Sequence, residues 1–474
     1  VTPCDPLDPA QAPLCASYSE QRVGVHLHGG LTPWISDGLP HQWIAPAGDP
    51  SPYKVGVGAR DVPDMAQDQV NYLPSGGAMS LYYPNQQSGR LMFYHDHAYG
   101  LTRLNVYAGV AAAYLLRDDV ETALTAGVED LPLVVQDKSF VPSDIAVQDS
   151  KWDLAKWGQP GDLWFPHMYE ENQDPTCSWD INCMNPLGRW DYGPWIWPPV
   201  QLPGNPVNPS AALTASIVPE AFMDVMMVNG TVYPKAVVQP KAYRLRILNA
   251  SNDRFLNLQL YYAIKGATFD TTRRAYFDRV TGTACIGAAG TPAECTEVAM
   301  VPRNGDTYTT VWGDDSTVPF DGRPGGVPNP VNAGPKMFQI ATEGGLLPAA
   351  VLKNAPPIPV TYDTDPKSMT VGNVIDGTLI LGPAERAEVV VDFSQVPAGS
   401  TLILYNDAPA AYPAGDQRYD YYTFGPSWVD AGGAPSPEVG KGPNTRTVMQ
   451  FVVDPAGTPA AAYDFAALQA AMPA

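Results

Sequence analysis

Charged residues and long helical patterns are both scarce in this sequence. Only 16% of the 474 residues are charged, whereas Pro (50) and Gly (42) are abundant. Because proline and glycine interrupt helices and favour turns, this profile excludes a helical bundle and indicates short strands joined by turns and long loops. We therefore expect an all-β fold, with helical patterns only over residues 150–156 and 463–472. The length exceeds what one hydrophobic core holds, so it predicts two or three domains.

Long apolar runs and basic residues are lacking as well. No apolar run reaches the roughly eighteen residues that a membrane-spanning helix needs, so no membrane span is expected. Lys and Arg total 28 against 49 Asp and Glu, and the net charge of −21 argues against a nucleic-acid partner, whose phosphates require a basic face. The acidic surface could attract metal cations or cationic substrates, or it could simply keep the protein soluble. The chain begins at Val1 without a signal peptide, which suggests a processed or truncated form.

The six cysteines include no Cys-x-x-Cys spacing, which argues against zinc ribbons and thioredoxin chemistry. They fall into three close pairs in loop-like stretches: Cys4 and Cys15, Cys177 and Cys183, Cys285 and Cys295. Three short-loop disulfides predict a secreted or periplasmic protein. Six reduced thiols remain the alternative, and they would allow a cytosolic location. Nucleophile elbows, phosphate-binding loops and nicotinamide fingerprints are absent, so nothing supports a hydrolase or a nucleotide enzyme.

Histidine is also rare, but its placement is informative. All six histidines precede residue 168, and four of them form two His-x-His pairs within segments that alternate like strands, residues 21–28 and 89–97. Side chains at positions i and i+2 of a strand point to the same face. Two such pairs on neighbouring strands would therefore converge four imidazoles on one spot, a donor set that suits copper, zinc, iron or nickel. The predicted ligands are His26, His28, His95 and His97.

The segments around these histidines resemble the copper motifs of bacterial multicopper oxidases. Residues 26–30 (HLHGG) followed by 36–38 (SDG) resemble the first motif, and residues 94–98 (YHDHA) followed by 101–109 (LTRLNVYAG) resemble the second. The likeness is greatest to the branch that contains spore-coat laccase, bilirubin oxidase and phenoxazinone synthase. It continues through short segments at 216–219, 228–230, 243–251, 342–347 and 382–386.

The resemblance implies three cupredoxin domains that share a three-copper cluster. By motif, His26 would bind the type 2 copper, His28 and His95 one type 3 copper, and His97 the other. Asp37 aligns with an acidic residue that helps to move protons near the cluster in relatives. The alternative for Asp37 is an ordinary Asp-Gly turn.

The resemblance also implies tandem cupredoxin-like Greek-key β-sandwiches with long loops and an aromatic-rich insertion. We expect cupredoxin domain 1 over residues 1–130, with its first strands outside this sequence. Residues 131–230 would be a connecting segment that contains the Trp- and Pro-rich insertion at 142–219. Residues 231–453 would be cupredoxin domain 2, and 454–474 a linker toward a third domain.

The sequence departs from the family pattern in ways that limit which copper sites the chain can form alone. The family's cluster takes histidines from two domains, and this chain has only one set; none of its cysteines has the histidine neighbour that a type 1 copper site needs. We therefore expect a second polypeptide that carries cupredoxin domain 3, with dioxygen and a small reducing substrate or metal ion as reactants. A non-catalytic copper-binding or scaffold protein is the alternative, whereas a two-domain nitrite reductase would need the absent His-Cys pair. His41 is expected in a loop, and His167 in packing within the insertion.

Overall fold

A computed structural model describes the chain in two compact units, which are treated separately. Unit 1 comprises Val1–Ala123 with Glu343–Gly345, and unit 2 comprises Leu124–Thr342 with Leu346–Ala474. The described residues are 18–57, 77–148, 152–155, 158–164, 222–265, 284–287, 291, 293–301, 327–409 except 364, 366 and 372, 420–423, 425 and 436–472.

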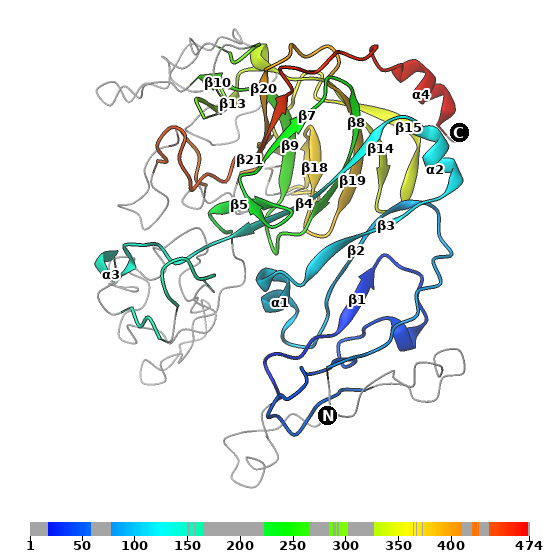
Figure 1. Cartoon of the computed structure of the whole chain (residues 1–474), viewed down its shortest axis with the longest axis vertical. Coiled ribbons are helices and arrows are strands. Elements are labelled where there is room, and N and C mark those ends of the chain that lie inside the picture. Colours follow the sequence, from blue (N-terminus) through cyan, green and yellow to red (C-terminus); the bar gives the residue numbers. More distant parts are fainter. Residues whose placement is uncertain are drawn as a thin grey trace. The chain divides into compact units, whose positions relative to one another are not determined.

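Unit 1 contains an antiparallel sheet with the strand order β1-β2-β3 (Figure 1). Its strands are β1 (Val25–His28), β2 (Arg90–Asp96) and β3 (Ala111–Leu116). Helix α1 (Thr102–Ala108) connects β2 to β3 and ends at Gly109, whose φ of 114° gives the left-handed cap that glycine adopts without strain. The 3-10 helix η1 (Trp34–Ser36) follows β1, and α2 (Asp119–Leu124) follows β3.

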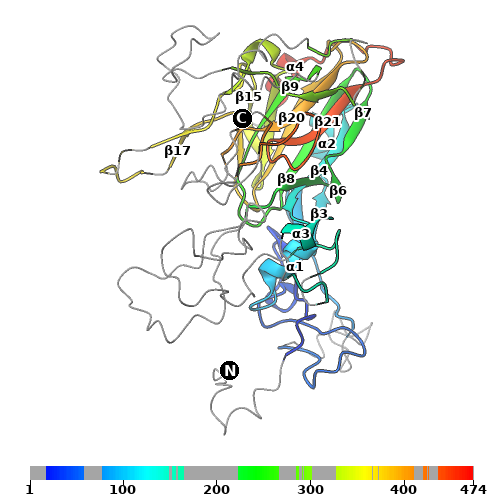
Figure 2. The same cartoon turned by 90° about the vertical axis from the view of Figure 1, so that its left-hand side faces the viewer.

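Unit 2 contains two large sheets (Figures 1 and 2). One has the order β15-β14-β19-β8-β4-β5-β6 and the other β18-β9-β20-β21-β7. The strands are β4 (Glu129–Lys138), β5 (Val225–Val228), β6 (Thr231–Val232), β7 (Lys235–Val238), β8 (Ala242–Asn249), β9 (Leu256–Tyr262), β14 (Met337–Thr342), β15 (Gly345–Lys353), β18 (Leu379–Leu381), β19 (Arg386–Asp392), β20 (Thr401–Asn406) and β21 (Thr447–Val453). Successive strands such as β7, β8 and β9 alternate between the two sheets, as in a β-sandwich.

Smaller elements complete unit 2. Three two-stranded pairs join β10 (Ile264–Lys265) to β11 (Cys295–Glu297), β12 (Met300–Val301) to β13 (Val327–Pro328), and β16 (Thr361–Tyr362) to β17 (Val374–Asp376). The helices among the described residues of unit 2 are α3 (Ile145–Gln148), the 3-10 helix η5 (Pro330–Asn332) and α4 (Phe465–Ala471). No helix in the described part of the chain is long and apolar enough to span a membrane.

Strand β8 shows how the sequence builds the core of unit 2. Its apolar residues Tyr243, Leu245 and Ile247 alternate along the strand and join the main hydrophobic cluster. The residues between them, Arg244 and Arg246, lie on the opposite face and are nevertheless fully buried. Alternation alone would place these arginines in water, so their burial requires charged partners.

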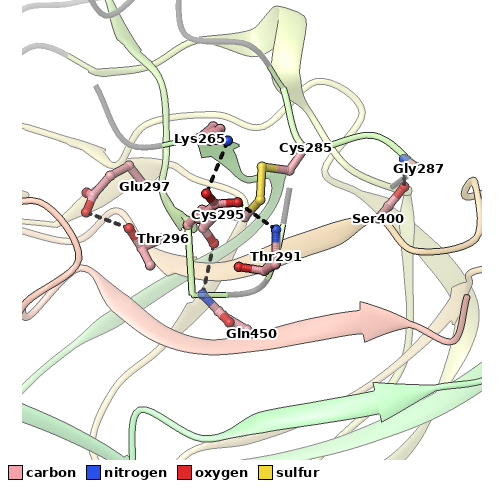
Figure 3. The surroundings of a disulfide bond; sticks show 10 residues. Lys265, Cys285, Gly287, Thr291, Cys295, Thr296, Glu297, Ser400 and Gln450 are labelled. Carbon is pink, nitrogen blue, oxygen red and sulfur yellow. Dashed lines mark hydrogen bonds and ion pairs between the residues drawn. A yellow bond between two sulfur atoms is a disulfide. The ribbon is translucent and has the colours of Figure 1, made fainter. Parts of the chain in front are cut away.

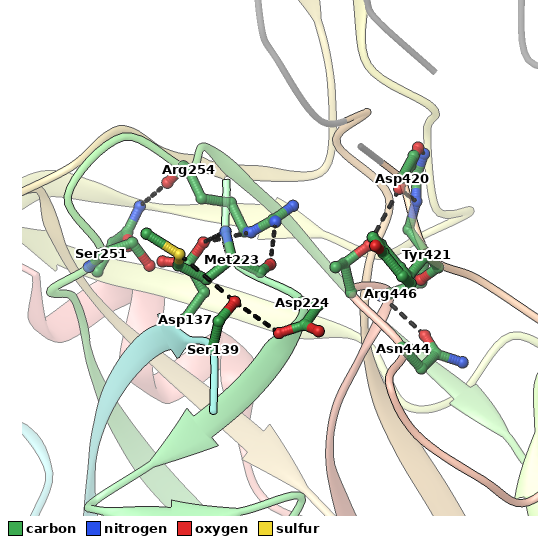
Figure 4. Close-up of polar contacts among 12 residues, drawn as sticks. Asp137, Ser139, Met223, Asp224, Ser251, Arg254, Asp420, Tyr421, Asn444 and Arg446 are labelled. Carbon is green, nitrogen blue, oxygen red and sulfur yellow. Dashed lines mark hydrogen bonds and ion pairs between the residues drawn. The ribbon is translucent and has the colours of Figure 1, made fainter. Parts of the chain in front are cut away.

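Those partners are acidic residues of neighbouring strands. Glu388 accepts hydrogen bonds from both Arg244 and Arg246, and Arg246 Nη2 lies 2.9 Å from Asp130 Oδ2. Two further buried ion pairs occur in unit 2, Arg254 with Asp137 and Arg446 with Asp420 (Figure 4). These buried arginines of unit 2 thus lie together with residues of opposite charge.

The predicted all-β fold is confirmed: strands dominate, and the described helices are short. The helical pattern over 463–472 is confirmed as α4, whereas residues 152–155 of the other pattern form a turn. The segment predicted as a linker lies on unit 2, where Tyr463 N donates to Asp392 Oδ2 at 2.9 Å and Phe465 stacks on Phe338 with centroids 3.8 Å apart. Most of the aromatic insertion at 142–219 lies outside the described residues.

One of the three predicted cysteine pairs is a disulfide. Cys285 and Cys295 are bonded and buried (Figure 3). The hydrogen bond from Gln450 Nε2 to Cys295 O and the ion pair of Lys265 with Glu294 surround the bridge. The remaining cysteines lie outside the described residues: Cys4, Cys15, Cys177 and Cys183.

Candidate metal centre

The pairing of β1 with β2 brings the two His-x-His pairs together. In this antiparallel ladder His26 lies opposite His95, and His28 lies opposite Phe93. His97 follows β2, and its N–H donates to Gly24 O at 2.7 Å. Because residues at i and i+2 share a face, all four imidazoles project from one side of the sheet.

The rings lie close enough to share a metal site. Ring centroids are 5.5 Å apart for His26 and His95, 5.3 Å for His28 and His95, and 4.9 Å for His26 and His97. One ring nitrogen from each of His26, His28 and His95 lies within 4.8 Å of the others, a grouping that could hold a metal ion. His97 contacts this group through His26 without belonging to that tightest set.

Backbone carbonyls orient two of the rings. His26 Nδ1 lies 2.6 Å from Asp37 O, and His95 Nδ1 lies 2.6 Å from Asp96 O. Since a carbonyl can only accept, Nδ1 carries the proton in both histidines and Nε2 keeps its lone pair. Metal-binding histidines usually donate their second ring nitrogen in this way, which fixes both the tautomer and the direction of the ligating nitrogen.

The other two rings also present nitrogens to the site. His28 Nδ1 lies 3.1 Å from His95 Nε2, so His28 donates this hydrogen bond when His95 Nε2 has no proton. A metal bound to His95 Nε2 would replace that contact. His97 Nδ1 is buried and has no hydrogen-bond partner among the described residues. A buried ring nitrogen without a partner, beside three convergent imidazoles, fits an arrangement made for a metal ion.

The surroundings favour neutral imidazoles. Burial lowers the pKa of His95, and the neighbouring His26 and His97 lower it further. Burial also lowers the pKa of His97, with His26 again adding to the effect. Only the neutral ring has a lone pair to offer, so these shifts favour the ligating form.

Asp37 lies beside His26 because of a tight turn. Its Oδ1 is 3.6 Å from His26 Nδ1 and accepts a hydrogen bond from Thr32 Oγ1 at 2.6 Å. The next residue, Gly38, has φ of 67°, and a Cβ there would come within 2.0 Å of Val25 O. The chain bends at Asp37, directly after η1, and only glycine at position 38 lets this bend lie against β1.

The side chain of Asp96 lies on the face of the sheet opposite the four imidazoles and binds backbone N–H groups there. Its side chain is fully buried, and Oδ1 accepts hydrogen bonds from Gly24 N at 2.8 Å and Ala98 N at 3.2 Å. These bonds join the residues just before the first histidine pair to those just after the second. Its second oxygen, Oδ2, is buried without a partner among the described residues.

Phe93 is the residue near the rings that sequence reasoning missed. It lies on the histidine face of β2, and its ring stacks against both His28 and His95. The alternation of the strand places Phe93 on the same face as His95, but its pairing with His28 depends on the strand register, which the sequence did not reveal.

The remaining histidines are not part of this group. His41 is exposed in the loop after η1, as predicted, and its ring lies 5.4 Å from that of Tyr99. His167 lies outside the described residues, so its predicted packing role stays a prediction.

Comparisons with known proteins agree on one kind of relative. The chain is 31% identical over 244 residues to a laccase of Bacillus subtilis, a match that covers 51% of this chain and 33% of that protein. It is 28% identical over 321 residues to the multicopper oxidase LPR1 of Arabidopsis thaliana, covering 66% of this chain and 41% of that one. The chain thus spans less than half the length of the curated relatives it matches.

Among solved structures, the McoA multicopper oxidase of Aquifex aeolicus is similar with a TM-score of 0.41 and 18% identity, over 93% of this chain and 51% of that one. A laccase-like multicopper oxidase of Ochrobactrum has a TM-score of 0.41 and 16% identity, over 94% of this chain and 52% of that one. No family model matches the sequence.

Proposed function

We propose that this chain, which belongs to the multicopper oxidase family, supplies half of the histidine ligands of a copper cluster at which dioxygen is reduced. The observation that carries the proposal is the convergence of four imidazoles on one face of β1 and β2. Two of them have Nδ1 engaged by carbonyls and Nε2 available. Neutral imidazole is a ligand that copper binds well.

Each histidine has a role in this proposal. His26 would hold the type 2 copper, His28 and His95 one type 3 copper, and His97 the other. The copper ions would supply the electron transfer and dioxygen chemistry, which no protein side chain provides. The chain's own part is to fix the imidazoles and, through the carboxylate of Asp37 beside His26, to hold a proton at the edge of the cluster.

The proposal includes a second polypeptide. Unit 1 would be the first cupredoxin domain and unit 2 the second. A third domain on another chain would supply the remaining cluster ligands and the type 1 copper. Electrons from a phenol, a pigment or a metal ion would enter there. The Cys285–Cys295 disulfide supports a secreted or periplasmic location, where disulfides persist.

A non-catalytic copper-binding or scaffold protein is the second candidate. One observation favours it: no cysteine of the chain has a histidine neighbour, so the chain holds no type 1 copper motif through which electrons could enter.

Protein purified from its source distinguishes the oxidase with a second polypeptide from the scaffold protein. The measurements are intact mass, peptide mapping and copper analysis. We expect a second polypeptide with a His-Cys-His motif to co-purify, together with more copper than this chain binds alone. If this chain binds copper but no second polypeptide co-purifies with it, the result supports the non-catalytic copper-binding or scaffold protein. The absence of copper from protein kept under copper-replete conditions would contradict both.

A further inference from the structure

We propose that Phe93 is a positioning residue of the metal centre, which sets the ring planes of His28 and His95 by packing against both rings. The inference rests on the proposed function, because it assigns Phe93 a role toward the same copper ligands. Phe93 touches no metal itself and acts through the two imidazoles.

The geometry of the three rings carries the proposal. The Phe93 ring centroid lies 4.7 Å from that of His28 and 5.0 Å from that of His95, with interplanar angles of 25° and 27°. These are stacked arrangements at the separations that aromatic pairs favour. Phe93 itself is only 4% exposed, so surrounding packing holds its ring in place.

The position of Phe93 in the sheet explains why it reaches both histidines. It lies directly opposite His28 on β1 and two residues before His95 on β2. Facing pairs on adjacent strands have Cβ atoms about 5 Å apart, so the aromatic ring contacts the imidazole across the ladder. The same side chain thus touches one ligand from each His-x-His pair.

The neighbouring strand offers no substitute for this contact. On the other side of β2, Phe93 lies opposite Ala113 and His95 lies opposite Ala111. Alanine methyl groups are too short to stack on an imidazole. In this sheet Phe93 is therefore the aromatic residue placed to restrain the two rings.

Restraint matters because the χ2 torsion of histidine is intrinsically broad. His95 is already held at Nδ1 by Asp96 O, but the His28 Nδ1 contact runs to His95 Nε2, which a metal would occupy. Stacking on Phe93 persists when that contact is replaced. It therefore keeps the His28 ring in place for binding, which lowers the cost of ordering the ligand.

The test compares three variants of the full-length chain in the metal-free state. Phe93→Met keeps the apolar bulk and removes the ring, Phe93→Tyr restores a ring, and Tyr94→Met removes a ring from the opposite, 38% exposed face of the same strand. The first measurement is the orientation of the isotope-labelled histidine rings, read by NMR from nuclear Overhauser contacts between each imidazole and its neighbours. We expect the contacts of the His28 and His95 rings to change in Phe93→Met and to return in Phe93→Tyr, while Tyr94→Met leaves them in place.

The second measurement is Cu(II) affinity by competition with a chelator. Contacts that orient metal ligands typically contribute 10–100-fold to affinity, so we expect Phe93→Met to weaken Cu(II) binding about tenfold, with rescue by Phe93→Tyr. If Phe93→Met proves unfolded by circular dichroism, Phe93→Leu replaces it.

The outcomes separate this inference from the proposed function. Imidazole orientations that stay unchanged in Phe93→Met overturn the role of Phe93, and so does unchanged Cu(II) affinity when the unsubstituted chain binds copper. Failure of the unsubstituted chain to bind Cu(II) overturns the proposed function instead, and the ring orientations measured by NMR then decide whether Phe93 positions the imidazoles.

Discussion

Asp96 and Gly38 show how single residues outside the four-histidine group hold the histidines in place. Asp96 joins the backbone before His26 to the backbone after His97, because its Oδ1 accepts hydrogen bonds from both Gly24 N and Ala98 N. Gly38 lets the turn that contains Asp37 pack on β1. Both residues thus help to determine where the four imidazoles lie.

Replacement of Asp96 should destabilise unit 1. Asp96→Ala leaves the buried N–H groups of Gly24 and Ala98 without their acceptor, and an unsatisfied buried donor costs about 1–3 kcal/mol. We expect a loss of about 3 kcal/mol in the free energy of unfolding of the metal-free protein, measured with urea. Asp96→Asn should lose less because its amide oxygen still accepts. Equal stability of Asp96→Ala and the unsubstituted protein would contradict the role of these bonds.

Gly38 and Gly48 form a matched pair for testing the turn. Both have positive φ, but a Cβ at Gly38 would meet Val25 O at 2.0 Å, whereas a Cβ at Gly48 meets nothing within 4 Å. Gly48→Ala should therefore cost only backbone strain, about 1 kcal/mol. Gly38→Ala should cost several kcal/mol, because the turn must also move away from β1. Similar losses in thermal or urea unfolding would show that the close approach is unimportant.

At the scale of elements, β8 and β19 combine an apolar core face with a buried charged face. The carboxylate of Glu388 on β19 accepts hydrogen bonds from both Arg244 and Arg246 of β8. The register of these two strands, in which Arg246 lies directly opposite Glu388, makes this pairing possible. A slip by one residue would separate the buried Glu388 from both arginines, so this pairing favours the observed register.

Glu388→Gln should be far more costly than the same change in an exposed pair. It removes the charge that two buried arginines share, and breaking a buried pair typically costs about 3–5 kcal/mol. Glu129, whose pair with Lys241 is solvent-exposed, provides the control: Glu129→Gln should cost at most about 1 kcal/mol. The comparison is made by urea unfolding at one salt concentration, and comparable losses would refute the argument.

At the scale of the whole molecule, the sequence predicted the all-β fold and the shared face of each histidine pair, because both follow from local patterns. It also placed Asp96 on the face opposite the histidines, in a structural role, and the hydrogen bonds of Asp96 agree. It did not reveal that Phe93 contacts both imidazoles, since this depends on how β1 and β2 pair. Burial of Arg244 and Arg246 was also beyond prediction. Their alternation with apolar residues is typical of a half-exposed strand, and the positions of Glu388 and Asp130 make their burial tolerable.

The pH dependence of stability should include a contribution from Asp224. Burial raises the pKa of this carboxyl to about 6, although the Ser139 hydroxyl donates a hydrogen bond to it and Arg254 lies nearby (Figure 4). Between pH 4 and 6 the folded state therefore holds a proton that the unfolded state has lost. The contribution of this group is consequently most favourable below pH 4 and declines as the pH rises to 6.

Asp224→Asn removes this titration. Relative to the unsubstituted protein, the variant should gain stability as the pH rises from 4 to 6, by up to about 3 kcal/mol, and then remain level. Urea unfolding at a series of pH values measures the difference. A difference that does not change with pH, or that changes in the opposite direction, would contradict the raised pKa.

The central claim is that the four histidines of β1 and β2 hold copper. The most direct measurement is an anomalous difference map, recorded at the copper absorption edge, from crystals of the chain loaded with Cu(II). We predict a peak beside His95 Nε2, within reach of the His28 ring, and its loss in His95→Ala. Copper bound only elsewhere, or an unchanged peak in His95→Ala, would contradict the claim.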